Sequence, residues 1–271
     1  MRKVSEIIYL IEKFAPLAMA ATWDKSGIQV ASAKENVERL AVMLDPTPDA
    51  LQKAVEAGAD MVLAHHPLAM QPRFLDTLGA YHKAVSLLLR FEIPLYSAHT
   101  SLDTALGGPV SWLGNALALQ NITPLEEIAP AGLDTTLPYG FGFYGDLQES
   151  LPYTVFVRRL TEALGRNFWT ACGPEIISVR RIACCPGSGS SYAEAAHAVE
   201  ADILITGDVK YHSALEAPLR ILDVGHFILE YTMMRLFSEK LAKELPDIDI
   251  IFIPASDPFA MEQLNTEANI I

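Results

Sequence analysis

Basic residues are scarce in this 271-residue sequence: 20 lysines and arginines stand against 33 aspartates and glutamates, so the formal net charge is −13. Nucleic-acid binding and attachment to anionic membranes both depend on lysine and arginine side chains that face phosphates. The composition therefore argues against a nucleic-acid partner and against a membrane surface. The surplus of carboxylates favours solubility first and the capture of cations second.

Cysteine is also rare, and no apolar run reaches the length of a membrane span. The three cysteines, Cys172, Cys184 and Cys185, are odd in number and two are adjacent, which argues against a disulfide framework and favours a reducing compartment. The apolar run Ile7–Ile11 is too short for a signal peptide. Apolar residues recur at helical spacing over residues 4–14. We therefore expect an amphipathic first helix in a cytoplasmic protein.

Apolar residues are abundant, at 51% of the chain, and they form short runs that alternate with helical stretches. Such runs are typical of parallel strands that are buried on both faces. The predicted strands are Leu40–Leu44, Met61–Ala64, Ile93–Tyr96, Ile182–Cys185, Ile203–Thr206, Ile221–Val224 and Ile248–Ile253. The predicted helices between them are Asp49–Ala57, His82–Phe91, Tyr192–Glu200 and Phe227–Glu244. The alternation predicts βαβ units.

Two segments of the chain repeat each other without a gap. Residues 39–66 match residues 181–208 at a constant offset of 142 positions. Both segments are predicted to form a strand, a turn and a helix, followed by an Ala-Asp pair and a second strand. The next strand repeats at an offset of 127 positions, and each copy ends in a histidine followed four positions later by an acid, His99–Asp103 and His226–Glu230. Chance similarity between two βαβ units is the alternative, but the matched histidine and acid pairs favour duplication.

The fold class predicted from this repeat is α/β, with two related lobes and largely parallel sheets. We expect the first lobe over residues 1–125 and the second over residues 126–244. The C-terminal segment, residues 245–271, is expected to pack back on the first lobe. Because ligands in open α/β sheets lie beyond the carboxyl ends of the strands, a site is expected in the cleft between the lobes.

Five side chains at the predicted strand ends could form a metal site: His65, His66, Asp103, His226 and Glu230. Pro67 helps to end the strand after the two adjacent histidines, so that both imidazoles could reach one cleft. A helix that begins after Gly225 would place His226 and Glu230 on one face. Taken separately, these residues also suit solvent-facing histidines, a polar helical pair and a carboxylate near a helix N-terminus.

Imidazole and carboxylate ligands together suit zinc, iron, manganese or cobalt. Five candidate ligands in a duplicated frame predict two divalent ions. Their four positive charges exceed the two negative charges of Asp103 and Glu230, so the site would favour a small anionic substrate. Paired ions activate water and stabilise developing negative charge.

The chain resembles the Nif-three-like family, also called the GTP cyclohydrolase 1 type 2 family. The matching motifs are Trp23-Asp-Lys-Ser-Gly27, Ala64-His-His-Pro67, His99-Thr-Ser-Leu-Asp103, Thr206-Gly-Asp-Val-Lys-Tyr-His212, Gly225-His-Phe-Ile-Leu-Glu230 and Ser256-Asp-Pro258. The resemblance implies a dinuclear metal centre, a duplicated fold and a homohexameric ring. It implies the same five ligands, with Glu230 bridging the ions. It also places His99 and His212 close by, either as groups that support the metal ligands or as catalytic groups that transfer protons.

Three functions remain open from the sequence. The first is a metal-dependent hydrolase acting on a nucleotide, with GTP suggested only by the family name. The second is a non-catalytic, metal-binding or regulatory assembly. The third is a metallo-phosphoesterase. The candidate ligands support activation of water, but they do not identify the substrate.

Overall fold

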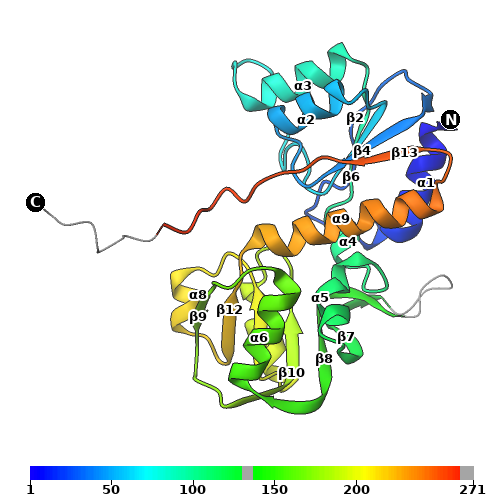
Figure 1. Cartoon of the computed structure of the whole chain (residues 1–271). Helices are drawn as coiled ribbons and strands as arrows, with labels where there is room; N and C mark the ends of the chain where they lie inside the picture. The colour runs from blue at the N-terminus through cyan, green and yellow to red at the C-terminus, as the bar shows by residue number, and fades with distance from the viewer. Residues whose placement is uncertain (130–136, 263–271) are drawn as a thin grey trace, which may run out of the picture.

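The computed structural model describes residues 1–129 and 137–262 and shows two α/β lobes with a long helix, α9 (His226–Glu244), between them (Figure 1). The first lobe contains a five-stranded sheet of order β13-β4-β5-β6-β2, and the second a six-stranded sheet of order β7-β8-β10-β11-β12-β9. The predicted α/β class is confirmed. Within the two described ranges, no helix is long and apolar enough to span a membrane.

Helices cover both faces of the first sheet. Its strands are β2 (Gly27–Val30), β4 (Arg39–Met43), β5 (Met61–Ala64), β6 (Leu95–Ser97) and β13 (Asp249–Phe252). All adjacent pairs are parallel except β2 with β6. Leu40 and Val42 of β4 pack toward α1 (Val4–Phe14) and α9, whereas Ala41 and Met43 pack toward α2 (Pro48–Glu56) and α3 (Ala80–Arg90). Burial on both faces explains why these strands contain almost no polar residues.

The second sheet is parallel only in its middle. Strands β10 (Ser178–Cys184), β11 (Ile203–Thr206) and β12 (Arg220–Asp223) are parallel, and β8 (Tyr139–Pro152), β7 (Gln120–Ala129) and β9 (Thr170–Cys172) add antiparallel edges. The helices of this lobe are α5 (Trp112–Ala116), α6 (Tyr153–Leu164), α7 (Ala193–Ala198) and α8 (Tyr211–Leu215). Strands β7 and β8 were not predicted from the sequence.

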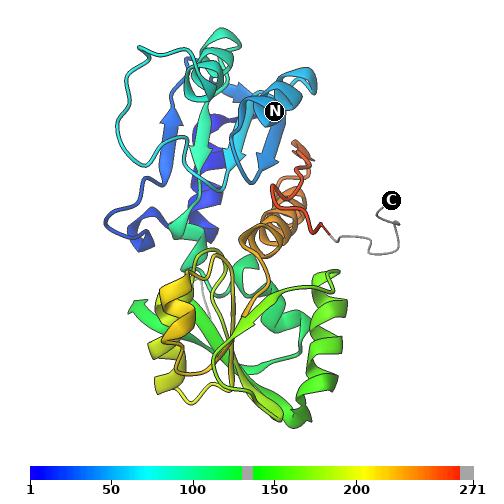
Figure 2. The same cartoon turned by 90° about the vertical axis from the view of Figure 1, so that its left-hand side faces the viewer.

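The chain enters the second sheet between Ala116 and Gln120, a few residues before the predicted boundary at residue 125. After α9 it returns to the first lobe, where β13 pairs in parallel with β4. Both views show α9 lying between the lobes (Figure 2). Residues 263–271 of the predicted returning segment lie outside the described residues.

The two lobes share hydrogen bonds at equivalent positions, which supports the duplication. Asp60 Oδ2 accepts from the backbone N–H groups of Glu38 and Arg39, at 2.9 and 3.1 Å, and the Arg39 guanidinium donates to the Ala57 carbonyl at 2.6 Å. The equivalent bonds in the second lobe are those of Asp202 Oδ2 with the N–H groups of Arg180 and Arg181, and of Arg181 with the Val199 carbonyl. Each of these residues lies 142 positions after its counterpart.

We expect Asp60→Ala and Asp202→Ala each to lower the free energy of unfolding by about 1–2 kcal/mol, because two backbone N–H groups lose their acceptor. Urea unfolding of each variant, followed by circular dichroism, measures the change. The control is Glu149→Ala, at an exposed position of β8. An unchanged unfolding midpoint for Asp202→Ala would show that the shared hydrogen bonds do not support the strand ends.

Candidate metal centre

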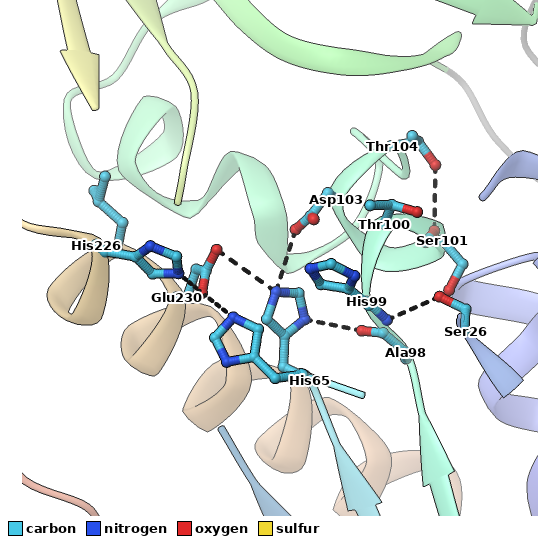
Figure 3. Close-up of polar contacts among 12 residues, drawn as sticks. Ser26, His65, Ala98, His99, Thr100, Ser101, Asp103, Thr104, His226 and Glu230 are labelled. Carbon is cyan, nitrogen blue, oxygen red and sulfur yellow. Dashed lines mark hydrogen bonds and ion pairs between the residues drawn. The ribbon is translucent and has the colours of Figure 1, made fainter. Parts of the chain in front are cut away.

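The structure brings the five predicted ligands together between the lobes (Figure 3). His65 and His66 directly follow β5, and Asp103 is the last residue of α4 (Thr100–Asp103), which follows β6. Helix α9 begins at His226, and Glu230 follows about one turn later. These side chains therefore lie on one side of that helix and point toward the ends of β5 and β6.

The carboxylate of Glu230 lies at the centre of the group and is only 3% exposed. Its Oε2 atom is 2.7 Å from His226 Nε2 and 3.1 Å from His66 Nε2, and its Oε1 atom is 3.6 Å from His65 Nε2. Burial alone raises the pKa of such a carboxyl group. The attraction of His65 and the hydrogen bonds with the other histidines outweigh burial and hold the pKa of Glu230 well below its usual range. Glu230 is therefore a fixed negative charge inside the protein.

Two buried polar atoms beside Glu230 fit an ion. Among the described residues, His65 Nε2 and Asp103 Oδ1 have no hydrogen-bond partner, although they lie only 3.6 Å apart. Buried polar atoms are nearly always satisfied. Two ligands of one tetrahedral ion, each about 2.1 Å from it, would lie about 3.4 Å apart. The spacing of His65 and Asp103 is therefore too long for a hydrogen bond and suitable for a shared ion.

The ligand atoms form groups within 4.8 Å of one another, and Glu230 belongs to two of them. One group combines it with His65 and Asp103, and the other with His66 and His226. A third group consists of His65, His66 and His99. The described residues thus provide nitrogen and oxygen ligands that could hold a metal.

Each of the four histidines uses Nδ1 to contact an oxygen atom outside these groups. The pairs are His66 with Asp45, His99 with Asp24 and His226 with Asp208, each at 2.7 Å, and His65 with the Ala98 carbonyl at 2.9 Å. An oxygen acceptor at Nδ1 keeps the proton on that nitrogen and leaves the Nε2 lone pair for a metal. The four histidines are therefore held in an orientation that leaves Nε2 for a metal once any proton on that nitrogen has been displaced.

The three aspartates that orient histidines were not assigned this role from the sequence. In the sequence, Asp45 was recognisable only as the residue after the predicted strand Leu40–Leu44. Asp24 and Asp208 were recognisable only as parts of the Trp23–Gly27 and Thr206–His212 motifs. Asp45, Asp208 and Asp24 lie 21, 18 and 75 positions, respectively, from the histidines that they contact, so no local sequence pattern joins each pair.

The two histidines predicted as catalytic groups lie in different places. The His99 ring centroid is 5.2 Å from that of His65, so His99 lies at the metal centre. His212 lies on the exposed side of α8 and belongs to none of the groups found within the described residues. Its catalytic role stays a prediction.

Glycines allow the second lobe to approach the site closely. Gly187, in the turn after β10, has a φ of +70°, and a Cβ atom there would collide with Glu230 Oε1. Gly207 follows β11, and a Cβ atom there would collide with the backbone of His226. These positions need glycine because the backbone itself forms a wall of the site.

Metal binding is expected to release protons. Burial lowers the pKa of His66, but its contacts with Asp45 and Glu230 raise it to about 10, and Glu230 and Asp208 likewise raise the pKa of His226 to about 9 against the effect of burial. Both histidines are therefore protonated on both ring nitrogens, and positively charged, at pH 7 in the metal-free protein. An ion must displace these protons, so the apparent affinity should rise as the pH increases toward those values.

Calorimetric titration of zinc at pH 7, in buffers of different ionisation enthalpy, should show release of about one proton or more per ion. The control is His82→Ala, on α3 and outside the metal-binding groups, which should release as many protons as the parent protein. Equal binding heats in all buffers would mean that the histidines are already neutral.

Comparison with known proteins agrees with this fold. The sequence profile of the Duf34/NIF3 (NGG1p interacting factor 3) family matches residues 2–258. A Clostridium perfringens protein named GTP cyclohydrolase 1 type 2 homolog is 31% identical over 264 residues, which cover 95% of this chain and 98% of the relative. The Drosophila melanogaster NIF3-like protein 1 is 25% identical over 277 residues, which cover 99% of this chain and 91% of the relative.

Solved structures show the same architecture. A Bacillus cereus protein related to NIF3 superposes with a TM-score of 0.86 at 23% identity, covering 96% of this chain and 99% of its own. The Methanocaldococcus jannaschii protein HcgD superposes with a TM-score of 0.79 at 29% identity, covering 93% of this chain and 97% of its own. The extent of the profile match and the 31% identity with a full-length relative show that this chain belongs to the Duf34/NIF3 (NGG1p interacting factor 3) family.

Proposed function

We propose that this protein holds two divalent metal ions and hydrolyses a nucleotide. The observation that carries the proposal is the position of Glu230, whose two carboxylate oxygens face two different sets of ligands. The choice of a nucleotide, with GTP as the first candidate, follows the name of the relative that is 31% identical.

One ion would be held by His65, Asp103 and Glu230, and the other by His66, His226 and Glu230. This set of imidazoles and carboxylates suits zinc, iron, manganese or cobalt. Paired divalent ions activate water and stabilise the negative charge that develops during hydrolysis. The protein contributes ligands whose orientation is already fixed by the hydrogen bonds at Nδ1.

His99 is suited to carry a proton at this site. Its Nδ1 atom contacts Asp24 Oδ1 at 2.7 Å, and Asp24 in turn accepts from the hydroxyl groups of Ser26 and Thr100, at 2.6 and 2.5 Å. Burial raises the pKa of Asp24, but these hydrogen bonds and the charge of His99 lower it overall, so the carboxylate stays ionised. An ionised carboxylate that contacts Nδ1 fixes the orientation of the imidazole, as an acid–base group requires.

Turnover of GTP tests the hydrolase proposal. Protein reconstituted separately with manganese, iron, cobalt and zinc should open the purine ring, seen as a change in the ultraviolet absorption spectrum without release of phosphate. Phosphate release instead would indicate a metallo-phosphoesterase. Full metal loading without turnover of any nucleotide would favour the non-catalytic assembly.

We also propose that the protein associates with itself as a homohexamer, which is supported by the family resemblance. Light scattering at micromolar concentration tests this association, and a monomer would contradict it.

Glu230 and His99 are expected to differ in their effect on the metals. Glu230→Gln keeps the shape of the side chain and removes a charge that both ions share, so at least one ion should be lost. His99→Ala should keep both ions and lower any hydrolytic rate by about 10²–10⁴-fold, the usual contribution of a positioned acid–base group. Elemental analysis and turnover of both variants beside the parent protein measure the two effects. Two tightly bound ions in Glu230→Gln, with one lost in His99→Ala, would reverse the assigned roles.

A further inference from the structure

A pocket of about 520 Å³ adjoins the metal centre. The proposed ligands His66 and His226 are among its lining residues. The lining also includes residues that follow α6 in the second lobe and the C-terminal segment after β13, residues 257–261. A molecule in this pocket would lie directly beside the proposed ions.

Aromatic side chains line the pocket from three separate segments of the chain. They are Phe168, Trp169, Phe227 and Phe259. Phe168 is 37% exposed and Phe259 is 79% exposed, so much of the surface of each ring is available to a ligand. Aromatic faces of this kind bind planar rings by stacking.

The charged residues of the lining do not favour phosphate. The lining contains four carboxylates, from Asp45, Asp208, Asp223 and Asp257, and three basic side chains, Arg166, His66 and His226. Both ring nitrogens of each histidine already face carboxylates. The Arg166 guanidinium already donates to the Val224 carbonyl at 2.7 Å, pairs with Asp257 and stacks on Phe168, with its central carbon 4.5 Å from the ring centroid. Phosphate recognition depends on available arginine, lysine or backbone N–H groups. A polyphosphate chain would therefore meet carboxylates and no unpaired cationic side chain among these lining residues.

The same carboxylates favour ligands that carry N–H groups. Asp45 uses Oδ1 for His66 and Asp208 uses Oδ2 for His226, so one oxygen of each remains to accept from a ligand. Their side chains are 44% and 47% exposed, which leaves these oxygens accessible. An ionised carboxylate only accepts hydrogen bonds, so it selects N–H and O–H donors.

We propose that this pocket binds the planar ring of a heteroaromatic substrate that carries amino or ring N–H donors, and leaves any phosphate groups outside. The proposal rests on the proposed function and specifies which part of the nucleotide enters the site. In this orientation the ring lies beside His66 and His226. Attack of water on the ring is then the favoured reaction, ahead of phosphoester hydrolysis.

Binding of guanosine, inosine and inorganic tripolyphosphate to the metal-free protein tests the proposal. The protein is used without metal because metal ions would themselves bind phosphate. Calorimetry should show that guanosine binds and that tripolyphosphate does not compete with guanosine. Inosine, which lacks the amino group, should bind roughly tenfold more weakly than guanosine. Phe168→Ala and Phe259→Ala should each raise the Kd for guanosine roughly tenfold through the loss of stacking. The matched control, Phe74→Ala, alters an exposed aromatic residue outside this pocket and should leave the Kd unchanged.

Circular dichroism of each variant separates loss of stacking from loss of folding. Competition by tripolyphosphate, or a guanosine Kd that is insensitive to both pocket substitutions in folded protein, would overturn the proposal. Guanosine binding that depends on Phe168 and Phe259, in a protein that turns over no nucleotide, would support the pocket and contradict the hydrolase. Turnover of GTP with a KM unaffected by these substitutions would support the hydrolase and contradict the pocket.

Discussion

The buried carboxylate of Glu230 is the constraint on which the site depends. A buried charge without partners costs several kcal/mol, so a carboxylate that is 3% exposed requires positive charge close by. It cannot turn toward solvent, because α9 is fixed by packing on both lobes: Leu229, Met233 and Phe237 belong to the same buried cluster as strands of both sheets. The position of the proposed ions is therefore set by the packing of one helix.

The duplicated scaffold produces an unequal pair of ligand sets. In the first lobe, His99 immediately precedes the four-residue helix α4 and Asp103 ends it. In the second lobe, His226 begins α9, which has 19 residues, and Glu230 lies in the same helix. His66 corresponds by the 142-position offset to Asp208, which holds His226 Nδ1. At this equivalent position the first lobe has a proposed ligand, His66, whereas the second lobe has Asp208, which orients the proposed ligand His226. Two similar lobes can in this way form one shared site between them.

The metal centre and the adjoining pocket share the same carboxylates. Asp45 and Asp208 each use one oxygen to orient a histidine that is a candidate ligand, and the same side chains line the pocket. The carboxylates that orient these imidazoles therefore also determine which chemical groups can lie next to the proposed ions. The Arg166–Asp257 pair joins the second lobe to the C-terminal segment and neutralises the one arginine of the lining.

Local patterns in the sequence determined most of the parallel core and the proposed ligands. Strands β5 and β11 have the predicted bounds, and α9 begins within one residue of its predicted start, because burial on both faces and helical spacing are readable within a few residues. Strands β7 and β8 were missed because they are antiparallel and interrupted by polar and exposed residues. Only the tertiary structure decided that Asp24, Asp45 and Asp208 contact histidines, that Glu230 is buried and belongs to two groups of candidate ligands, and that a pocket adjoins these groups. Each of these features joins residues that are far apart in the chain, and their contact depends on how the two lobes pack around α9.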